Sequence, residues 1–309
     1  MISFVVPLYN CLPFTQATAK SLRESLPAGL EHEIILVDDG STDGTREWLA
    51  GLGGPFRVVL NERNLGYAAA NNRGAAVAKG EQIVLLNNDL VLPRGWLEPM
   101  LAAQKTLRES AGLVGNVQRN ASSGVVDHAG LFINHKGKPE HVRALPPLLS
   151  RLAAPVRKVT AVTGACLLVK AGLWRRLGGF DEGYINGCED VDLALRARAA
   201  GRVNVVALRS VILHHISASP GRKLHDERNT RRLALRWREE LAILGQDDWT
   251  RNYFLSRLPD PRDFPEPRLA WQAVFFLLRL RRRPPPDALS GMKEAIAVEL
   301  TRWDRILGR

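Results

Sequence analysis

The first ninety residues alternate short apolar segments with amphipathic ones, and this alternation constrains the fold more than any other feature of the chain. Runs rich in Val, Ile and Leu predict four strands, at 2–8, 33–39, 56–61 and 81–89. The segments between them predict helices that extend to about Leu26 and lie near 43–51 and 67–78. Strands that alternate with helices predict an α/β fold with a mainly parallel sheet flanked by helices.

Polar side chains follow each of these apolar runs. They are Tyr9 and Asn10, Asp38 and Asp39, Asn61, and Asn87, Asn88 and Asp89. Asn and Asp are common turn formers, so they could simply end the strands. However, ligands of parallel α/β sheets bind beyond the carboxyl ends of the strands. We therefore expect these side chains to line a binding site at one edge of the sheet.

The rest of the chain is less uniform. Residues 116–160 predict mobile loops around a short strand or two, which could form a lid or face an acceptor. Later segments predict further strands and helices, at 161–169, 171–177, from Glu189 onward, at 203–208, and up to His215. Beyond Ser219 the chain is helical and basic, with Pro-rich breaks. We therefore expect a first domain at 1–219 and a basic helical C-terminal extension at 220–309.

The positive charge of the chain is unevenly distributed. The 309 residues carry a formal charge of +11, yet residues 1–150 hold 14 Lys and Arg against 14 Asp and Glu. Residues 151–309 hold 29 basic and 18 acidic residues. This asymmetry predicts an anionic partner for the second half, either a membrane surface or a polyanion. A basic module that binds nucleic acid is one alternative, but the sequence has no aromatic-rich RNA-binding signature and no zinc finger.

The cysteines and the apolar runs indicate the cellular compartment in which we expect the protein. Cys11, Cys166 and Cys188 are widely spaced, which indicates neither a disulfide framework nor a zinc site and favours a reducing cytoplasm. The first residues have no basic region and meet a proline early, so we expect no signal peptide. The apolar run at 269–280 is too short to span a bilayer.

Five motifs, taken together, resemble family 2 glycosyltransferases of the GT-A fold. They are "VVPLYN", "ILVDDGSTDGT", "NLGYAAANNRGAAVAKGEQIVLLNND", "GACLLVKAGLWRRLGGFDE" and "CEDVDLALRARAAG". They occur in order between residues 2 and about 219. Within the family, the chain most resembles the bacterial rhamnosyltransferase-like group that builds cell-surface polysaccharide.

The resemblance implies an activity. We expect an inverting, metal-assisted transfer of a sugar from a dTDP- or UDP-sugar, with dTDP-L-rhamnose the first choice, to a surface glycan on a lipid carrier. Residues 1–115 would bind the nucleotide sugar, and 116–219 would bind the acceptor and carry catalysis. An N-acetylhexosaminyl- or galactofuranosyltransferase of the same fold is the alternative.

The donor site that the resemblance implies centres on Asn87, Asn88 and Asp89, where the family has a D-x-D motif. Here the first carboxylate is an amide. Asp89 would bind Mg²⁺ or Mn²⁺, which prefer oxygen ligands and neutralise the departing diphosphate. Asn87 would bind the ribose or a metal-bound water, and Asn88 completes the donor-binding set.

Other donor contacts come from the preceding loops. Pro7 and Tyr9 match the base-binding loop, and Asp39 matches the family residue that hydrogen-bonds the base. Asp38 could instead cap the following helix or support its loop. The family shapes its donor pocket with residues that correspond to Asn64, Gly66 and Asn71.

The catalytic residues that the resemblance implies come from "CEDVDL". Asp190 matches the general base, and Glu189 would hold acceptor hydroxyls or orient Asp190. A helix start enriched in acids for dipole reasons is the structural alternative. Two histidines end a later strand, and of these His214 is the expected metal or diphosphate contact and His215 the second choice. His128 is expected to be a loop or acceptor residue.

The tail superficially resembles the Q-x-x-R-W signature of processive synthases. Leu233 stands where the Gln would be, so we expect a non-processive enzyme. The basic helices are expected to lie on the anionic inner face of the cell membrane, where a lipid-linked acceptor would be found. The alternative is an ordinary packing helix with a solvated basic end.

Overall fold

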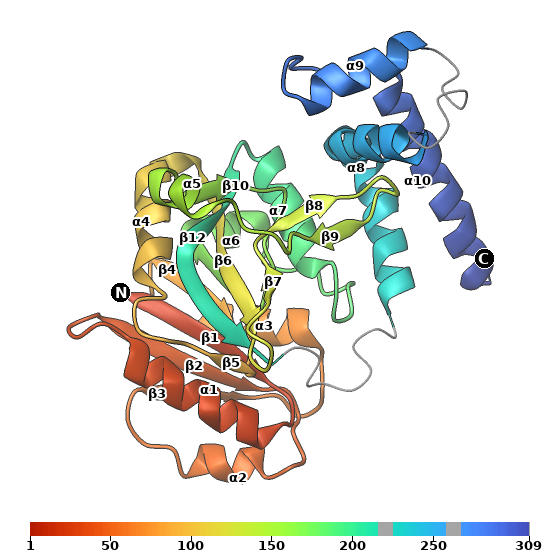
Figure 1. The fold of residues 1–309 in the computed structure, drawn as a ribbon. Coiled ribbons are helices and arrows are strands. Elements are labelled where there is room, and N and C mark those ends of the chain that lie inside the picture. The colour runs from red at the N-terminus through yellow and green to blue at the C-terminus, as the bar shows by residue number, and fades with distance from the viewer. Residues whose placement is uncertain (216–224, 258–266, 309) are drawn as a thin grey trace. The chain divides into compact units, whose positions relative to one another are not determined.

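The computed structural model describes residues 1–215, 225–257 and 267–308. Its backbone divides into two compact units (Figure 1). Unit 1 comprises Met1–Leu131 and His141–His225, and unit 2 comprises Phe132–Glu140 and Asp226–Arg309. The expected domain boundary at 219 lies outside the described residues. Residues 132–140, which we expected in the first domain, cluster instead with unit 2.

Unit 1 is built on a ten-stranded sheet. The strands are β1 (Ile2–Leu8), β2 (His32–Asp38), β3 (Phe56–Leu60), β4 (Gln82–Leu86), β5 (Leu90–Val91), β6 (Ala111–Asn120), β7 (Val126–His128), β10 (Val156–Lys158), β11 (Cys166–Lys170) and β12 (Val203–His214). The main order is β10-β12-β6-β11-β4-β1-β2-β3, with β5 paired to β12 and β7 to β6. A separate two-stranded sheet pairs β8 (Leu131–Ile133) with β9 (Pro139–His141).

The long strands are mainly parallel, which confirms the predicted fold class. β2 pairs in parallel with β1 and β3, β1 with β4, and β6 with β12. β11 is the exception, because it runs antiparallel between β4 and β6. The carboxyl ends of β1, β2, β4, β6 and β12 therefore share one edge of the sheet with the amino end of β11.

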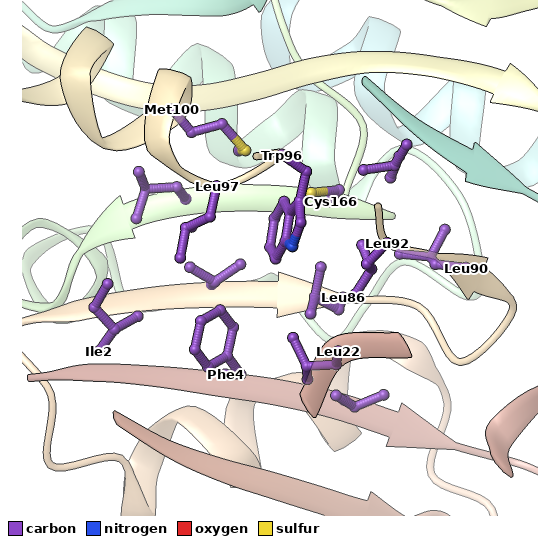
Figure 2. Packing of buried hydrophobic residues seen from close by; sticks show 14 of the residues in the cluster. Ile2, Phe4, Leu22, Leu86, Leu90, Leu92, Trp96, Leu97, Met100 and Cys166 are labelled. Atoms are coloured by element: carbon purple, nitrogen blue, oxygen red, sulfur yellow. The ribbon is translucent and has the colours of Figure 1, made fainter. Parts of the chain in front are cut away.

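Helices cover both faces of this sheet. They are α1 (Leu12–Ser25), α2 (Thr45–Ala50), α3 (Tyr67–Val77), α4 (Glu98–Leu107), α5 (Leu148–Ala153), α6 (Ala171–Leu177) and α7 (Glu189–Ala199), with a 3₁₀ turn at Arg108–Ser110. The even-numbered residues of β1 enter a core with Leu22 of α1 and Met100 of α4, as Figure 2 shows for Phe4. On the opposite face, Gly74 of α3 lies directly over Val5 and Val37. The period of two along β1 thus divides its side chains between two helical layers.

A buried tryptophan packs in the core of unit 1. Trp96 is buried beside Phe4, with ring centroids 6.3 Å apart, and its Nε1–H donates to Ser25 Oγ at 3.1 Å. Each large apolar side chain buried in this cluster contributes about 1.5–3 kcal/mol to folding. The sheet edge that carries the polar residues is therefore held by a well-packed scaffold.

Two regions differ from expectation. The two strands expected between 203 and 215 form a single strand, β12, because a register shift between Ala207 and Val211 lets it continue along β6. Residues 116–160 contain more regular structure than one or two strands: β6 continues to Asn120, and four short strands and α5 follow. Three-residue strands are too short to show a clear hydrophobic period in the sequence.

Unit 2 is helical. It contains α8 (Asp226–Arg257), α9 (Pro267–Leu277) and α10 (Asp287–Ile306). α8 has a non-helical backbone at Trp237, with φ −118° and ψ 25°. Residues 132–140 of unit 2 join its helices through two side-chain contacts. Lys138 Nζ lies 2.9 Å from Glu299 Oε2, and His135 Nδ1 lies 3.1 Å from Asp248 Oδ2. In the parts of the chain that the structure describes, no helix has the length and apolar content of a membrane span.

Candidate active site

The loops that follow β1 and β2 are tied together. Asn10 has a left-handed backbone (φ 55°), and its N–H donates to Ser41 Oγ at 2.8 Å while its Oδ1 accepts from Thr42 N–H at 2.8 Å. This arrangement leaves Tyr9 exposed at the strand end. Pro7, which matches the base-binding loop of the family, is a buried residue of β1, within the strand predicted at 2–8. Proline donates no backbone hydrogen bond, and β1 tolerates it there because its pairing with β4 ends at Val5.

Asp38 supports the loop after β2. Its buried carboxylate accepts from the backbone N–H of Gly40 at 3.3 Å and of Ser41 at 3.2 Å, and it pairs with Arg46 Nε at 2.7 Å. These contacts match the structural alternative for this residue.

Asp39 shapes the next loop. Its Oδ1 accepts from Asn61 Nδ2 at 2.8 Å and from the N–H of Leu65 at 2.9 Å, and its Oδ2 accepts from the N–H of Gly66 at 2.9 Å. The carboxylate is buried in doing so. Asp39 therefore fixes the segment that leads into α3 from the strand edge.

The three residues expected to form a donor pocket lie at the start of α3. Asn64 Oδ1 also accepts from Gly66 N–H, at 2.9 Å, and Gly66 has φ +93°, a conformation that favours glycine. Asn71 is buried, with its Nδ2 donating to Tyr67 O at 2.9 Å. No described residue donates to Asn71 Oδ1, which is a buried acceptor.

Asn87 and Asn88 make different contacts beyond β4. The N–H of Asn87 donates to Ala165 O at 2.9 Å, but its Oδ1 is buried and accepts no hydrogen bond from the described part of the chain. Asn88 Nδ2 donates to Thr15 Oγ1 at 2.9 Å, which ties the strand end to α1. Asn87 thus presents a free acceptor, whereas Asn88 is engaged in holding the loop.

Asp89 and His214 face one another. Both are buried, and His214 Nε2 lies 3.2 Å from Asp89 Oδ1, although their angles do not make a hydrogen bond. β12 and β5 pair at His214 and Leu90, which brings the two side chains together from distant parts of the chain. The next histidine, His215, packs its ring against Phe14 at 4.9 Å.

These side chains fit a divalent cation. Among the residues that the structure describes, no three His, Cys, Asp or Glu side chains gather into a metal-holding group. One carboxylate and one imidazole do meet, and Asp89 Oδ1 and Asn87 Oδ1 are both buried oxygens without a hydrogen bond. Carboxylate and amide oxygens are ligand types suited to Mg²⁺ and Mn²⁺. A cation held here would need further oxygen ligands from a bound molecule.

His128 lies close to this edge as a buried residue of β7. Burial, and then the charges of His141 and His214, hold its pKa well below the usual value of 6.5, so the ring is neutral at pH 7. Its Nδ1 lies 3.1 Å from His141 Nδ1, and its Nε2 accepts from Thr163 N–H at 3.5 Å. The sequence reasoning did not single out His141, since nothing local marks the partner of a histidine thirteen residues away.

Three acids begin α7, but they differ in exposure. Glu189 is buried and its Oε2 accepts from Gly187 N–H at 2.6 Å, and Asp192 is buried against Arg196 Nε at 2.8 Å. Asp190 is partly exposed, with its Oδ1 accepting from Val191 N–H at 2.8 Å and its Oδ2 from Gly164 N–H at 2.9 Å. Of the three, Asp190 is the carboxylate that can meet a bound molecule.

Sequence reasoning missed residues that connect these parts. Tyr67 Oη donates to Gly164 O at 2.8 Å. Asn72 accepts from Phe180 N–H and donates to Phe180 O, each at 2.9 Å, which secures the "GGFDE" turn before α7. Tyr67 and Asn72 belong to the motif that begins "NLGYAAANNRG". Their position in this motif was the sequence feature that could have indicated a role for them.

The comparison with known families agrees with this arrangement. Residues 3–163 match the family model described as "Glycosyl transferase family 2". The chain belongs to this family. The match covers the loops after β1, β2 and β4, whereas His214 and the start of α7 lie outside it.

Curated relatives match over part of their own length. The chain is 32% identical over 242 residues to an uncharacterized protein, y4gI, of Sinorhizobium fredii, covering 75% of this chain and 26% of that protein. It is 30% identical over 217 residues to the N-acetylglucosaminyl-diphospho-decaprenol L-rhamnosyltransferase of Mycobacterium tuberculosis, covering 61% of this chain and 68% of that enzyme. The chain thus spans about a quarter of the first relative and two thirds of the second.

Solved structures identify the fold as GT-A. A crystal structure of GalNAc-T7 with UDP, GalNAc and Mn²⁺ superposes with a TM-score of 0.62 at 17% identity. The match covers 98% of this chain and 58% of that one. The match to the family model agrees with the family that the motifs predicted.

Proposed function

We propose that the chain is an inverting, metal-assisted glycosyltransferase that moves a sugar, first of all L-rhamnose from dTDP-L-rhamnose, to a hydroxyl of a lipid-linked surface glycan. The observation that carries this proposal is the meeting of Asp89 and His214 at the sheet edge that also carries Asp190. Its support for the donor and acceptor comes from the mycobacterial relative, whose name specifies L-rhamnosyl transfer to a decaprenol-linked sugar.

The donor would be held at the ends of β1, β2 and β4. Asp89 and His214 would hold Mg²⁺ or Mn²⁺, with Asn87 Oδ1 turned toward the same region to meet the ribose or a metal-bound water. The cation, when bound, supplies the positive charge that neutralises the departing diphosphate. Because the protein offers one carboxylate there, the diphosphate of the donor must complete the coordination. Tyr9, exposed beside the loop that Asp39 secures, offers a stacking face to the base.

Asp190 would be the general base. As the acceptor oxygen attacks the anomeric carbon, Asp190 takes the hydroxyl proton on a carboxylate oxygen. Attack from the side opposite the leaving diphosphate inverts the anomeric configuration. Glu189, buried against the preceding loop, would orient the segment that carries Asp190 and the acceptor.

A second candidate is transfer of an N-acetylhexosamine from a UDP-sugar. The superposed GalNAc-T7 structure contains UDP, GalNAc and Mn²⁺. At 17% identity this likeness carries the fold and not the donor, so dTDP-L-rhamnose stays the first choice.

The acceptor would be presented at an anionic membrane surface by α9. Trp271 and Phe275 of this helix, and Leu278 just beyond it, are 63%, 45% and 63% exposed and recur at the spacing of one helical face. Ala273 and Phe276 are buried on the other face. Exposed arginines, Arg279, Arg282 and Arg283, follow the helix. Aromatic side chains beside arginines suit the interface of an anionic bilayer.

The proposal is tested by a binding screen of nucleotide sugars, with and without Mn²⁺, by calorimetry. We expect one dTDP- or UDP-sugar to bind at micromolar levels with Mn²⁺ and at least about tenfold more weakly without it. The selected donor is then incubated with a short-chain N-acetylglucosaminyl-diphospho-polyprenol, and the anomeric configuration of the product is read by NMR. Binding to none of the sugars, together with salt-sensitive binding to DNA, would favour the nucleic-acid alternative. A product that retains the donor configuration would overturn the inverting mechanism.

A further inference from the structure

One short segment before β11, Thr163–Ala165, receives contacts from several parts of the candidate site. The N–H of Gly164 donates to Asp190 Oδ2 at 2.9 Å, and the O of Ala165 accepts from Asn87 N–H at 2.9 Å. Thr163 N–H donates to His128 Nε2 at 3.5 Å. The segment therefore contacts both the loop that contains Asn87 and the proposed base, Asp190.

Tyr67 contacts this segment from α3. Its Oη donates to Gly164 O at 2.8 Å. A Cβ at position 164 would lie 2.9 Å from Tyr67 Oη and 3.2 Å from its Cε1, so only a residue without a side chain allows the hydroxyl to approach this closely. The ring is held independently, because its centroid lies 5.9 Å from that of Phe180. The hydroxyl can thus be removed without emptying the ring's position.

Tyr67 also reaches the loop that carries Asp190. Its backbone N–H donates at 3.2 Å to Oδ1 of Asn186, a residue in the left-handed region with φ 53°. Cys188, two residues later, is the N-cap of α7, which begins with Glu189 and Asp190. On its other side, Tyr67 follows Gly66, whose N–H is held by Asp39. Tyr67 therefore joins the loop before α3 to Gly164, which binds Asp190, and to Asn186 in the loop that leads to Asp190.

From these contacts we propose that Tyr67 is a positioning residue for the transfer reaction, acting through Gly164 to hold the carboxylate of Asp190. Gly164 is the weak point of the chain of contacts, because glycine has the greatest backbone freedom of any residue. Tyr67 Oη fixes its carbonyl, and this in turn limits the orientation of the N–H that binds Asp190 Oδ2. The inference rests on the proposed role of Asp190 as general base and adds a link between donor loop and base that neither the motifs nor the comparisons assign.

The alternative is that the hydroxyl only stabilises the fold. Loss of this part-buried hydrogen bond would then lower the stability of the fold and leave the chemical step unchanged. The two roles differ in a measurable way, because a positioning role depends on a functional base and a purely structural role does not.

The test is a double-mutant cycle with Tyr67→Phe and Asp190→Asn. Turnover, KM for each substrate and donor affinity are measured with dTDP-L-rhamnose, or the nucleotide sugar that the screen selects, and the N-acetylglucosaminyl-diphospho-polyprenol acceptor. We expect Tyr67→Phe to lower kcat about 3- to 15-fold, the rate equivalent of one net hydrogen bond, and to leave donor affinity within about twofold. In the Asp190→Asn background the same change should have no further effect on kcat. Tyr253→Phe, the same chemical change in unit 2, is the control and should match the wild type.

Two results would overturn the inference. One is an unchanged kcat in Tyr67→Phe, and the other is an equal loss of kcat with and without Asp190. Either result leaves the proposed function standing if Asp190→Asn alone is strongly impaired. If Asp190→Asn alone is nearly as active as the wild type, the assignment of the base fails, and the inference about Tyr67 fails with it.

Discussion

At the residue scale, the unusual feature of the site is that it has one carboxylate where the family motif has two. Asn87 keeps the shape of an aspartate and places in a buried position an oxygen that accepts no hydrogen bond from the described residues, but it brings no charge. In the proposed site Asp89 would then be the acidic ligand, and His214 Nε2 lies 3.2 Å from its Oδ1. A cation bound by this pair depends on the donor diphosphate more than one bound by two carboxylates, so metal and donor should bind together.

Asp89→Asn should therefore lower the affinity for the nucleotide sugar in Mn²⁺ by at least about tenfold, because it removes the charged ligand and keeps the side-chain shape. Donor titrations by calorimetry, with and without Mn²⁺, measure this. Asp247→Asn, an exposed position in unit 2, is the matched control and should bind as the wild type does. Unchanged Mn²⁺-dependent binding in Asp89→Asn would remove Asp89 from the metal site.

Individual residues also show what the sequence could predict. Asp39, Asn71 and Asp190 were singled out from motifs, and the structure places Asp39 just after β2, Asn71 in α3 and Asp190 at the start of α7. Tyr67 and Gly164 were not, because their hydrogen bond joins residues 97 positions apart. A local sequence pattern does not indicate such a long-range contact, whereas polar residues at the end of a strand are visible in the sequence itself.

At the scale of elements, predictions succeeded where a segment is long and periodic. α3 and α6 occupy the expected ranges, at Tyr67–Val77 and Ala171–Leu177. β12 was expected as two strands because the polar and charged residues near Arg209 interrupt its apolar pattern. Its pairing with β6 overrides that local signal across the register shift.

The element that we propose contacts the membrane is α9, which exposes Trp271 and Phe275. Replacing Trp271 and Phe275 together by Ser should weaken binding to vesicles of phosphatidylglycerol and phosphatidylcholine by at least about tenfold, because about 1.5–3 kcal/mol per inserted apolar side chain would be lost. Vesicle sedimentation measures this, and added salt should weaken the wild type as well.

The control for α9 is a pair of equally exposed apolar residues elsewhere in unit 2. Leu235→Ser with Ile243→Ser, on α8, removes similar exposed apolar surface and should leave vesicle binding unchanged. If the α8 and α9 variants lose binding equally, or neither does, α9 is not the membrane face.

A second element-scale prediction concerns Glu299 of α10. Burial alone would raise the pKa of its carboxyl group, but the hydrogen bonds and charges of Lys138 and Arg302 outweigh burial and lower it. A carboxylate with a lowered pKa stabilises the folded state above its unfolded pKa, about 4.3, and this contribution is lost as the pH falls through the folded value.

Glu299→Gln should therefore lower the free energy of unfolding by about 1–3 kcal/mol at pH 7, and the difference from the wild type should shrink toward zero near pH 3. Urea denaturation followed by tryptophan fluorescence at both pH values measures the difference. Glu294→Gln, an exposed change on the same helix, should have little effect at either pH. A Glu299→Gln deficit that is as large at pH 3 as at pH 7 would contradict the role given to its charge.

At the scale of the whole molecule, the family and the fold were predictable from the sequence, because five motifs in order leave few alternatives to a GT-A sheet. The division of the chain was less predictable. Residues 132–140 cluster with the helices of unit 2 through His135 and Lys138, contacts that have no counterpart in local hydrophobicity. The donor sugar and the acceptor are properties of the site's shape with ligands bound, which motif order does not specify.

We propose that this molecule uses one edge of its sheet to bind a nucleotide sugar and Asp190 to activate the acceptor. The most direct test is the initial rate of transfer by Asp190→Asn at saturating donor and acceptor, paired with its donor affinity by calorimetry. Asparagine keeps the shape of the side chain but takes no proton, so we predict a rate lower by about 100- to 10,000-fold and a donor affinity close to that of the wild type. A rate above about a tenth of the wild-type value, with donor binding intact, would show that Asp190 is not the general base.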